Sequence, residues 1–228
     1  MVTCHHCQGI ERQFDRKTAE RDLRRFRRRG ALRTTRLLID MLRAPGVEGA
    51  TLLDVGGGIG AIHHLLLDAG AREVVHVDVS PAYLEAARSE AARRGHIERA
   101  RFIHADFVAA ADELSGADIV TLDRVICCYP DMEPLVGLAA DKACRVIGAV
   151  YPRETWWMRV GLGLANLMMR LQRSPFRVYL HSPTAIDAVL RQRGFEPRSV
   201  RRTIGWHVEV YARRGGSGAD RSAQGRVR

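Results

Sequence analysis

The sequence predicts an α/β fold in which a mostly parallel sheet carries helices on both faces. Short apolar runs typical of buried strands alternate with helical segments between residues 51 and 151. The end of the chain differs, because strand-like segments at 195–203 and 206–211 flank Ile204-Gly205 and predict an antiparallel hairpin. A length of 228 residues suits one large domain or one domain with an added lobe.

The five strands predicted for the parallel part comprise residues 51–55, 73–79, 101–104, 118–122 and 145–151. Helix starts support the alternation, since Ser80-Pro81 is a serine N-cap followed by proline at the first helical position. The predicted organisation is an N-terminal basic helical lid (1–45), a main domain (46–212) with a helical, substrate-covering insertion (153–193), and a disordered tail (213–228).

Charge and composition restrict the class of protein. The net charge is +10, and the cations are almost all arginines, concentrated at residues 11–36. We interpret this stretch as a solvated helix face, although arginines also suit an anionic substrate or nucleic acid. An odd number of cysteines, five, argues against a disulfide framework. No membrane span or signal peptide is visible, so a cytoplasmic enzyme is expected.

The central motif is a glycine-rich turn after the first strand. Asp54 ends the strand, and Gly56, Gly57, Gly58 and Gly60 follow before a helix. Glycines there let the backbone turn sharply and approach a ligand closely. The spacing G-x-G-x-G differs from the G-x-G-x-x-G of nicotinamide-dependent dehydrogenases, and an acid at the strand end would oppose a pyrophosphate. The turn therefore favours a ligand with an amino group and a sulfonium cation.

Further acids end the next three strands. Asp78, followed by Val79, lies where a carboxylate would accept from ribose hydroxyls, and Asp106 beside Phe107 suits an adenine ring. Asp123 ends the fourth strand. Ligands of open α/β sheets bind at the carboxyl edge of the strands, so we expect these side chains to surround one cofactor.

The motif at 54–60 resembles motif I of class I S-adenosylmethionine-dependent methyltransferases. The segment 76–80 is similar to their ribose-binding motif, and 105–107 to their adenine motif. The resemblance implies a seven-stranded, Rossmann-like sheet, S-adenosyl-L-methionine as cofactor, and loop glycines beside its methionine part. Gly57 departs from the family, which usually has Cys or Ser there.

The methyl acceptor is less defined. The segment 123–130 lacks the Asn/Asp-Pro-Pro-Tyr motif of enzymes that methylate amines in nucleic acids, which favours an oxygen, sulfur or carboxylate of a small molecule. The segments 151–153 and 181–183, with Phe176, more weakly resemble magnesium-protoporphyrin IX O-methyltransferases. That resemblance implies an anionic, tetrapyrrole-like substrate with a carboxylate acceptor, which needs no general base.

Candidate catalytic residues are Tyr129 and His181 as bases and Arg153 as a partner for a second carboxylate. Apolar side chains that could cover a flat ring follow Arg153, namely Trp156, Trp157, Leu162, Leu164 and Met168. No metal site is predicted, because four consecutive residues, Cys4-His5-His6-Cys7, do not easily wrap one tetrahedral ion. The alternatives are an RNA methyltransferase and a non-catalytic binding protein that keeps the fold.

Overall fold

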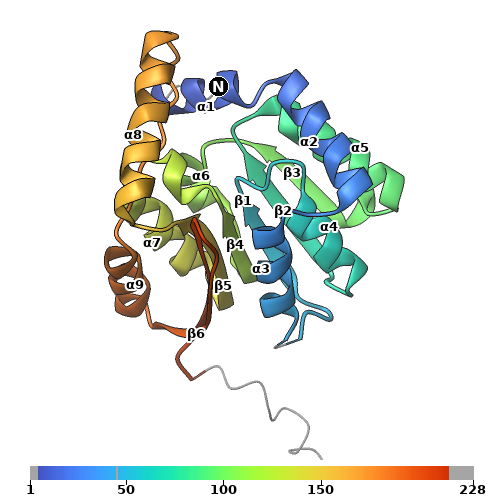
Figure 1. Ribbon diagram of the computed structural model, residues 1–228. Helices are drawn as coiled ribbons and strands as arrows, with labels where there is room; N and C mark the ends of the chain where they lie inside the picture. The colour runs from blue at the N-terminus through green and yellow to red at the C-terminus, as the bar shows by residue number, and fades with distance from the viewer. Residues whose placement is uncertain (1–4, 45, 216–228) are drawn as a thin grey trace, which may run out of the picture.

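The computed structural model describes residues 5–44 and 46–215 and confirms the predicted sheet (Figure 1). The strands are β1 (Thr51–Val55), β2 (Glu73–Asp78), β3 (Ala100–His104), β4 (Ala117–Asp123), β5 (Ala143–Pro152), β6 (Phe195–Arg202) and β7 (Trp206–Arg213). They form one 7-stranded sheet in the order β3-β2-β1-β4-β5-β7-β6. β7 runs antiparallel to both its neighbours, and β1 to β5 are mutually parallel.

β1 is the central strand and sets the position of the glycine turn. It pairs with β2 and β4, and Asp54 lies opposite His76 on one side and Thr121 on the other. The residues of β1 from Leu52 to Val55 are buried, as expected of a parallel strand covered on both faces. The reversal of strand order between β1 and β4 places a ligand-binding crevice at their carboxyl ends.

Helices cover both faces of the sheet (Figure 1). One apolar cluster joins the sheet to α7 (Met132–Lys142) and α9 (Pro183–Gln192), with the short α6 (Phe107–Ala110) at its edge. A second cluster lies on the opposite face under α3 (Arg33–Arg43) and α4 (Ala61–Asp68), while α5 (Pro81–Arg94) packs beside β3.

The described part of the N-terminal segment consists of three helices. Within the segment predicted as a basic helical lid, a first short helix, α1, spans His5–Gln13. The predicted basic helix is α2 (Arg16–Arg29); the Asp15 side chain caps it by accepting from the Thr18 amide at 2.8 Å. Both helices lie above the carboxyl edge of the sheet (Figure 1). Cys4 lies outside the described residues.

Within the predicted helical insertion, residues 156–171 form the single helix α8 (Trp156–Leu171). No residue of α8 is buried, and Trp156 is 77% exposed. Among the residues described, no helix has the length and apolarity to cross a bilayer. Of the segment predicted to be a disordered tail, Arg213 ends β7, and residues 216–228 lie outside the described part of the chain.

Candidate functional site

The glycine turn leaves β1 and opens α4. The Gly56 amide donates to the Val77 carbonyl at 2.8 Å, which holds the turn against the end of β2. Gly56 has a φ of 59°, and a Cβ there would lie 2.6 Å from a methyl group of Val125. A residue other than glycine would therefore be strained and crowded at this position. The turn is built for close backbone approach, as the motif predicts.

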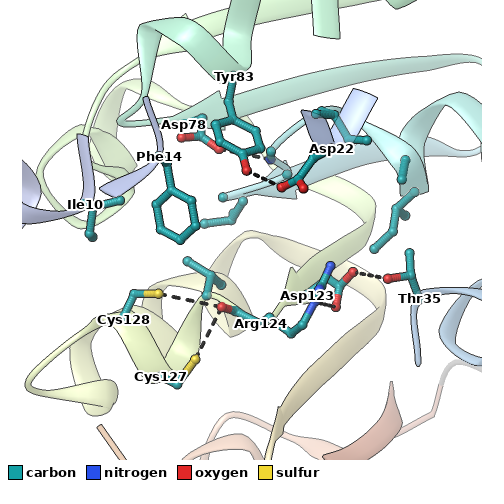
Figure 2. Close-up of a pocket in the computed structure, with 18 of the residues that line it drawn as sticks. Ile10, Phe14, Asp22, Thr35, Asp78, Tyr83, Asp123, Arg124, Cys127 and Cys128 are labelled. Atoms are coloured by element: carbon teal, nitrogen blue, oxygen red, sulfur yellow. Dashed lines mark hydrogen bonds and ion pairs between the residues drawn. The ribbon is translucent and has the colours of Figure 1, made fainter. Parts of the chain in front are cut away.

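Asp78 joins the glycine turn to the start of α5. Its carboxylate accepts from the Gly58 amide at 3.0 Å and from the Ser80 amide at 2.8 Å. The side chain keeps 8% exposure and faces the space beside the turn (Figure 2). Each carboxylate oxygen has a second lone pair, so Asp78 can still accept from a ligand hydroxyl.

Asp106 and Phe107 lie after β3, with different orientations. The Asp106 carboxylate caps α6 by accepting from the Val108 amide at 3.2 Å, and it also accepts from the Tyr129 hydroxyl. Phe107 is buried against the space below the turn. Burial and the neighbouring Asp106 raise the pKa of Tyr129, so this phenol keeps its proton near neutral pH.

Asp123 ends β4 and accepts hydrogen bonds from two side chains, one on α3 and one on the next residue in the chain. It accepts from the Thr35 hydroxyl of α3 at 2.7 Å and from the Arg124 guanidinium at 3.1 Å. Arg124 has a φ of 62°, an uncommon value for a non-glycine residue. Its carbonyl accepts from the thiols of Cys127 and Cys128, which face the same space (Figure 2).

These groups surround a cavity of about 550 Å³ at the carboxyl edge of the sheet. Seven of the ten predicted cofactor-binding residues line it: Gly56, Gly57, Gly58, Asp78, Val79, Phe107 and Asp123. The structure thus brings together residues from the ends of β1, β2, β3 and β4.

Three of the predicted cofactor-binding residues do not line the cavity. Asp54 is fully buried behind the turn, where it accepts from the Thr121 hydroxyl at 2.7 Å and contacts His63 Nδ1 at 2.9 Å. Gly60, with a φ of 79°, is the N-cap of α4, and Asp106 caps α6. Asp54 and Asp106 support the wall of the site from behind, because neighbouring residues already occupy their carboxylates.

The N-terminal helices form a roof over the cavity (Figure 2). The Tyr83 hydroxyl donates to Asp22 of α2 at 2.6 Å, and the Ser80 hydroxyl donates to the Phe14 carbonyl at 2.7 Å. The Phe14 ring packs edge-on against Tyr83 and Phe176, both with ring centroids at 5.6 Å. The sequence indicated a lid but did not single out these side chains. The available signal was the Asp15 cap, which places Phe14 just before α2.

Of the three candidate catalytic residues, only Tyr129 lines the cavity. The Tyr129 hydroxyl donates to Asp106. His181 does not line the cavity; its Nε2 forms a hydrogen bond with the Tyr129 carbonyl at 2.9 Å. Arg153 bonds the Thr203 carbonyl at 3.2 Å near the β6–β7 turn and is also outside the cavity lining. Their roles in catalysis stay predictions.

The apolar residues of α8 are likewise divided. Leu162 lines the cavity, whereas Trp156, Leu164 and Met168 are more than half exposed. Cysteines are more prominent near the cavity than the sequence indicated, since the disulfide-bonded Cys7 and the free Cys127 and Cys128 share one apolar cluster beside it. The Cys127 thiol and burial together raise the pKa of Cys128, so Cys128 stays protonated near neutral pH.

Comparison with known proteins agrees with this geometry. Residues 52–146 match a family model described as a methyltransferase domain. A ribosomal protein L11 methyltransferase of Yersinia pseudotuberculosis is 31% identical over 105 residues, which are 46% of this chain and 35% of that protein. The chain thus spans about a third of the length of the curated relatives it matches.

Solved structures show the same fold. Magnesium protoporphyrin IX methyltransferase from Synechocystis PCC 6803, crystallised with S-adenosylhomocysteine, is 20% identical with a TM-score of 0.63, and the match covers 79% of this chain and 81% of that one. An O-methyltransferase family protein from Burkholderia thailandensis is 19% identical with a TM-score of 0.66, covering 90% and 62%.

Fold, matched domain and site together define the class. The resemblance to class I S-adenosylmethionine-dependent methyltransferases is confirmed by the fold and by the match of residues 52–146 to a methyltransferase domain. Members of this class use S-adenosylmethionine, and a second structure of the Synechocystis protein holds that molecule.

Proposed function

We propose that this chain transfers a methyl group from S-adenosylmethionine to an oxygen or sulfur atom of a small molecule. The observation that carries the proposal is the roofed cavity of about 550 Å³, in which the glycine turn and Asp78 form one wall. A cavity of this size suits a cofactor with a modest acceptor beside it.

The chain offers suitable groups for each part of the cofactor. Asp78 has acceptor capacity left for ribose hydroxyls, Phe107 supplies an apolar wall for adenine, and the bare backbone at Gly56 to Gly58 allows close approach of the methionine part. Asp22 and Asp123 add carboxylates that favour an amino group and a sulfonium. Bound there, S-adenosylmethionine supplies an electrophilic methyl group.

The state of the side chains around the cavity favours an acceptor that needs no base. Tyr129 and Cys128 both hold their protons near neutral pH. A carboxylate acceptor is already an anion, so these residues need only align it and exclude water. Arg124 and Arg25 line the same cavity, and a guanidinium can pair with a second carboxylate of the substrate. These features support an anionic small molecule.

RNA is the alternative acceptor, and the exposed arginines of α2 favour it. The side chains of Arg16 and Arg24 are 90% and 63% exposed. Both also form ion pairs with Glu20, at 3.2 and 3.6 Å, so their charge is partly balanced. The roof formed by α1 and α2 covers the carboxyl edge, which favours a small acceptor over a polymer.

The proposal is tested in two stages with the purified full chain. Calorimetry with S-adenosylhomocysteine first measures cofactor binding, and absence of binding would point to a non-catalytic protein. Incubation with methyl-labelled S-adenosylmethionine and either a metabolite extract or total RNA then assigns the acceptor by mass spectrometry. Label in a small anionic molecule is the expected result. Label in RNA alone would overturn the small-molecule assignment.

A further inference from the structure

A cluster of buried histidines lies behind the glycine turn, away from the cavity lining. His63 and His64 come from the first turn of α4, and His76 comes from β2 beside Asp54 of β1. All four side chains have 0% exposure. The His63 ring lies 4.2 Å from the His64 ring and 4.9 Å from the His76 ring, measured between centroids.

Several nitrogens in this cluster have no hydrogen-bond partner. They are His63 Nε2, His64 Nε2, and both ring nitrogens of His76. Burying an unsatisfied polar atom is unfavourable, and native proteins leave few such atoms. Leucine or valine would fill the same space without that cost, so a bound partner would account for the imidazoles.

The structure assigns this cluster as a binding site for one divalent transition-metal ion of the Zn²⁺ type, held by Asp54, His63 and His76. Ligand atoms of these three residues all lie within 4.8 Å of one another. Ligands of one tetrahedral zinc ion lie about 3.4 Å apart for bonds of about 2.1 Å, so modest side-chain adjustments would complete the site.

The ligand types select the ion. Two imidazoles and one carboxylate suit Zn²⁺ and its first-row neighbours, whereas Mg²⁺ and Ca²⁺ prefer ligands that are all oxygen. The Thr121 hydroxyl donates to Asp54 Oδ1 at 2.7 Å and orients the carboxylate, as groups behind metal ligands commonly do.

Gly60 keeps this space open. A Cβ at position 60 would collide with the His63 ring and lie 2.9 Å from His64 Nε2. The last glycine of the turn therefore serves the histidine cluster, which explains why it does not line the cavity. An ion here would join β1, β2 and α4 directly beneath the turn.

The test measures metal binding by the full chain and does not depend on activity. Chain stripped with a chelator is titrated with Zn²⁺ and, separately, with Co²⁺. We expect one equivalent per chain, and a rise in melting temperature of about 5–10 °C with Zn²⁺ at about 100 times its Kd. The Co²⁺ form should show d–d absorption without thiolate charge-transfer bands.

Two sets of variants locate the ion. His76→Leu and Asp54→Asn should weaken Zn²⁺ binding at least about tenfold. The matched control, Cys4→Ser with Cys7→Ser, removes both N-terminal cysteines and should leave the affinity unchanged. Circular dichroism and gel filtration check that each variant folds.

Two results would overturn the assignment: no binding of either ion, or binding that the cysteine variant abolishes and His76→Leu leaves intact. If His76→Leu fails to fold, X-ray absorption of the wild-type zinc form decides, because sulfur ligands would contradict the site. None of these results depends on whether the chain transfers methyl groups.

Discussion

Asp78→Ala is the most informative perturbation of the cofactor site. In the structure this carboxylate accepts from two backbone amides, of Gly58 and Ser80, and the proposed function adds ribose hydroxyls. A hydrogen bond to a charged group contributes about 1.5–3 kcal/mol, so losing the ribose contact should weaken cofactor binding about 10- to 150-fold. Leaving two amides without partners should also lower the free energy of unfolding by about 2–6 kcal/mol.

The assay is calorimetry with S-adenosylhomocysteine, run where urea denaturation shows that the variant is folded. Asp78→Asn keeps the shape and one carbonyl acceptor, and it should lie between wild type and Asp78→Ala in both affinity and stability. Asp112→Asn changes an exposed acid and controls for the loss of charge alone. A folded Asp78→Ala chain that binds within about threefold of wild type would refute the placement of the ribose at Asp78.

Three further predictions concern the support of the site. The fully buried Glu90 carboxylate would have a raised pKa from burial alone, but hydrogen bonds from three arginines outweigh this and hold its pKa well below the ordinary 4.5. Its stabilisation is therefore present above about pH 4.5 and is lost as the pH falls toward the folded-state pKa. Glu90→Gln should lower the free energy of unfolding by about 1.5–3 kcal/mol at pH 7 and by less at pH 3. Urea denaturation measures both values, and a difference between wild type and variant that does not depend on pH would contradict the stabilising role of the ionised Glu90 carboxylate. Gly9→Ala places a Cβ 2.9 Å from the backbone of the segment after α8, so it should lower the free energy of unfolding by about 1–3 kcal/mol and weaken cofactor binding. Gly161→Ala meets open space and should do neither. Equal effects of the two variants would exclude close packing of α1. Tyr129→Phe removes the hydrogen bond to Asp106 and should weaken cofactor binding a few-fold. The pH profile of kcat should not change, because the Tyr129 phenol holds its proton near neutral pH. A shifted profile would instead support the predicted role of Tyr129 as a base.

Much of the fold followed from local patterns. The alternation of strands and helices, the glycine turn and the hairpin depend on neighbouring residues, and these features were predicted close to their observed bounds. α1 was not predicted as a separate helix, and its packing depends on Phe176, a residue far along the chain.

The site was predicted in outline but not in its detailed contacts. Acids at strand ends were identified, yet the sequence does not show which way each one faces. Asp54 turns away because Thr121 and His63 bond its carboxylate, and Asp106 is taken up by Tyr129. These partners lie on other elements, so only the packed structure reveals them. The histidine cluster escaped notice for the same reason.

The roof contacts bear on the sequence of events in a catalytic cycle. Asp78 ends β2, and Ser80 and Tyr83 follow it at the start of α5. Asp78 faces the proposed ribose, whereas Ser80 and Tyr83 hold Phe14 and Asp22 of the roof. Binding of the cofactor's ribose at Asp78 would thus favour closure of α1 and α2 over the cavity. We expect a compulsory order, in which the methyl donor enters first, the acceptor binds second, and the demethylated donor departs last.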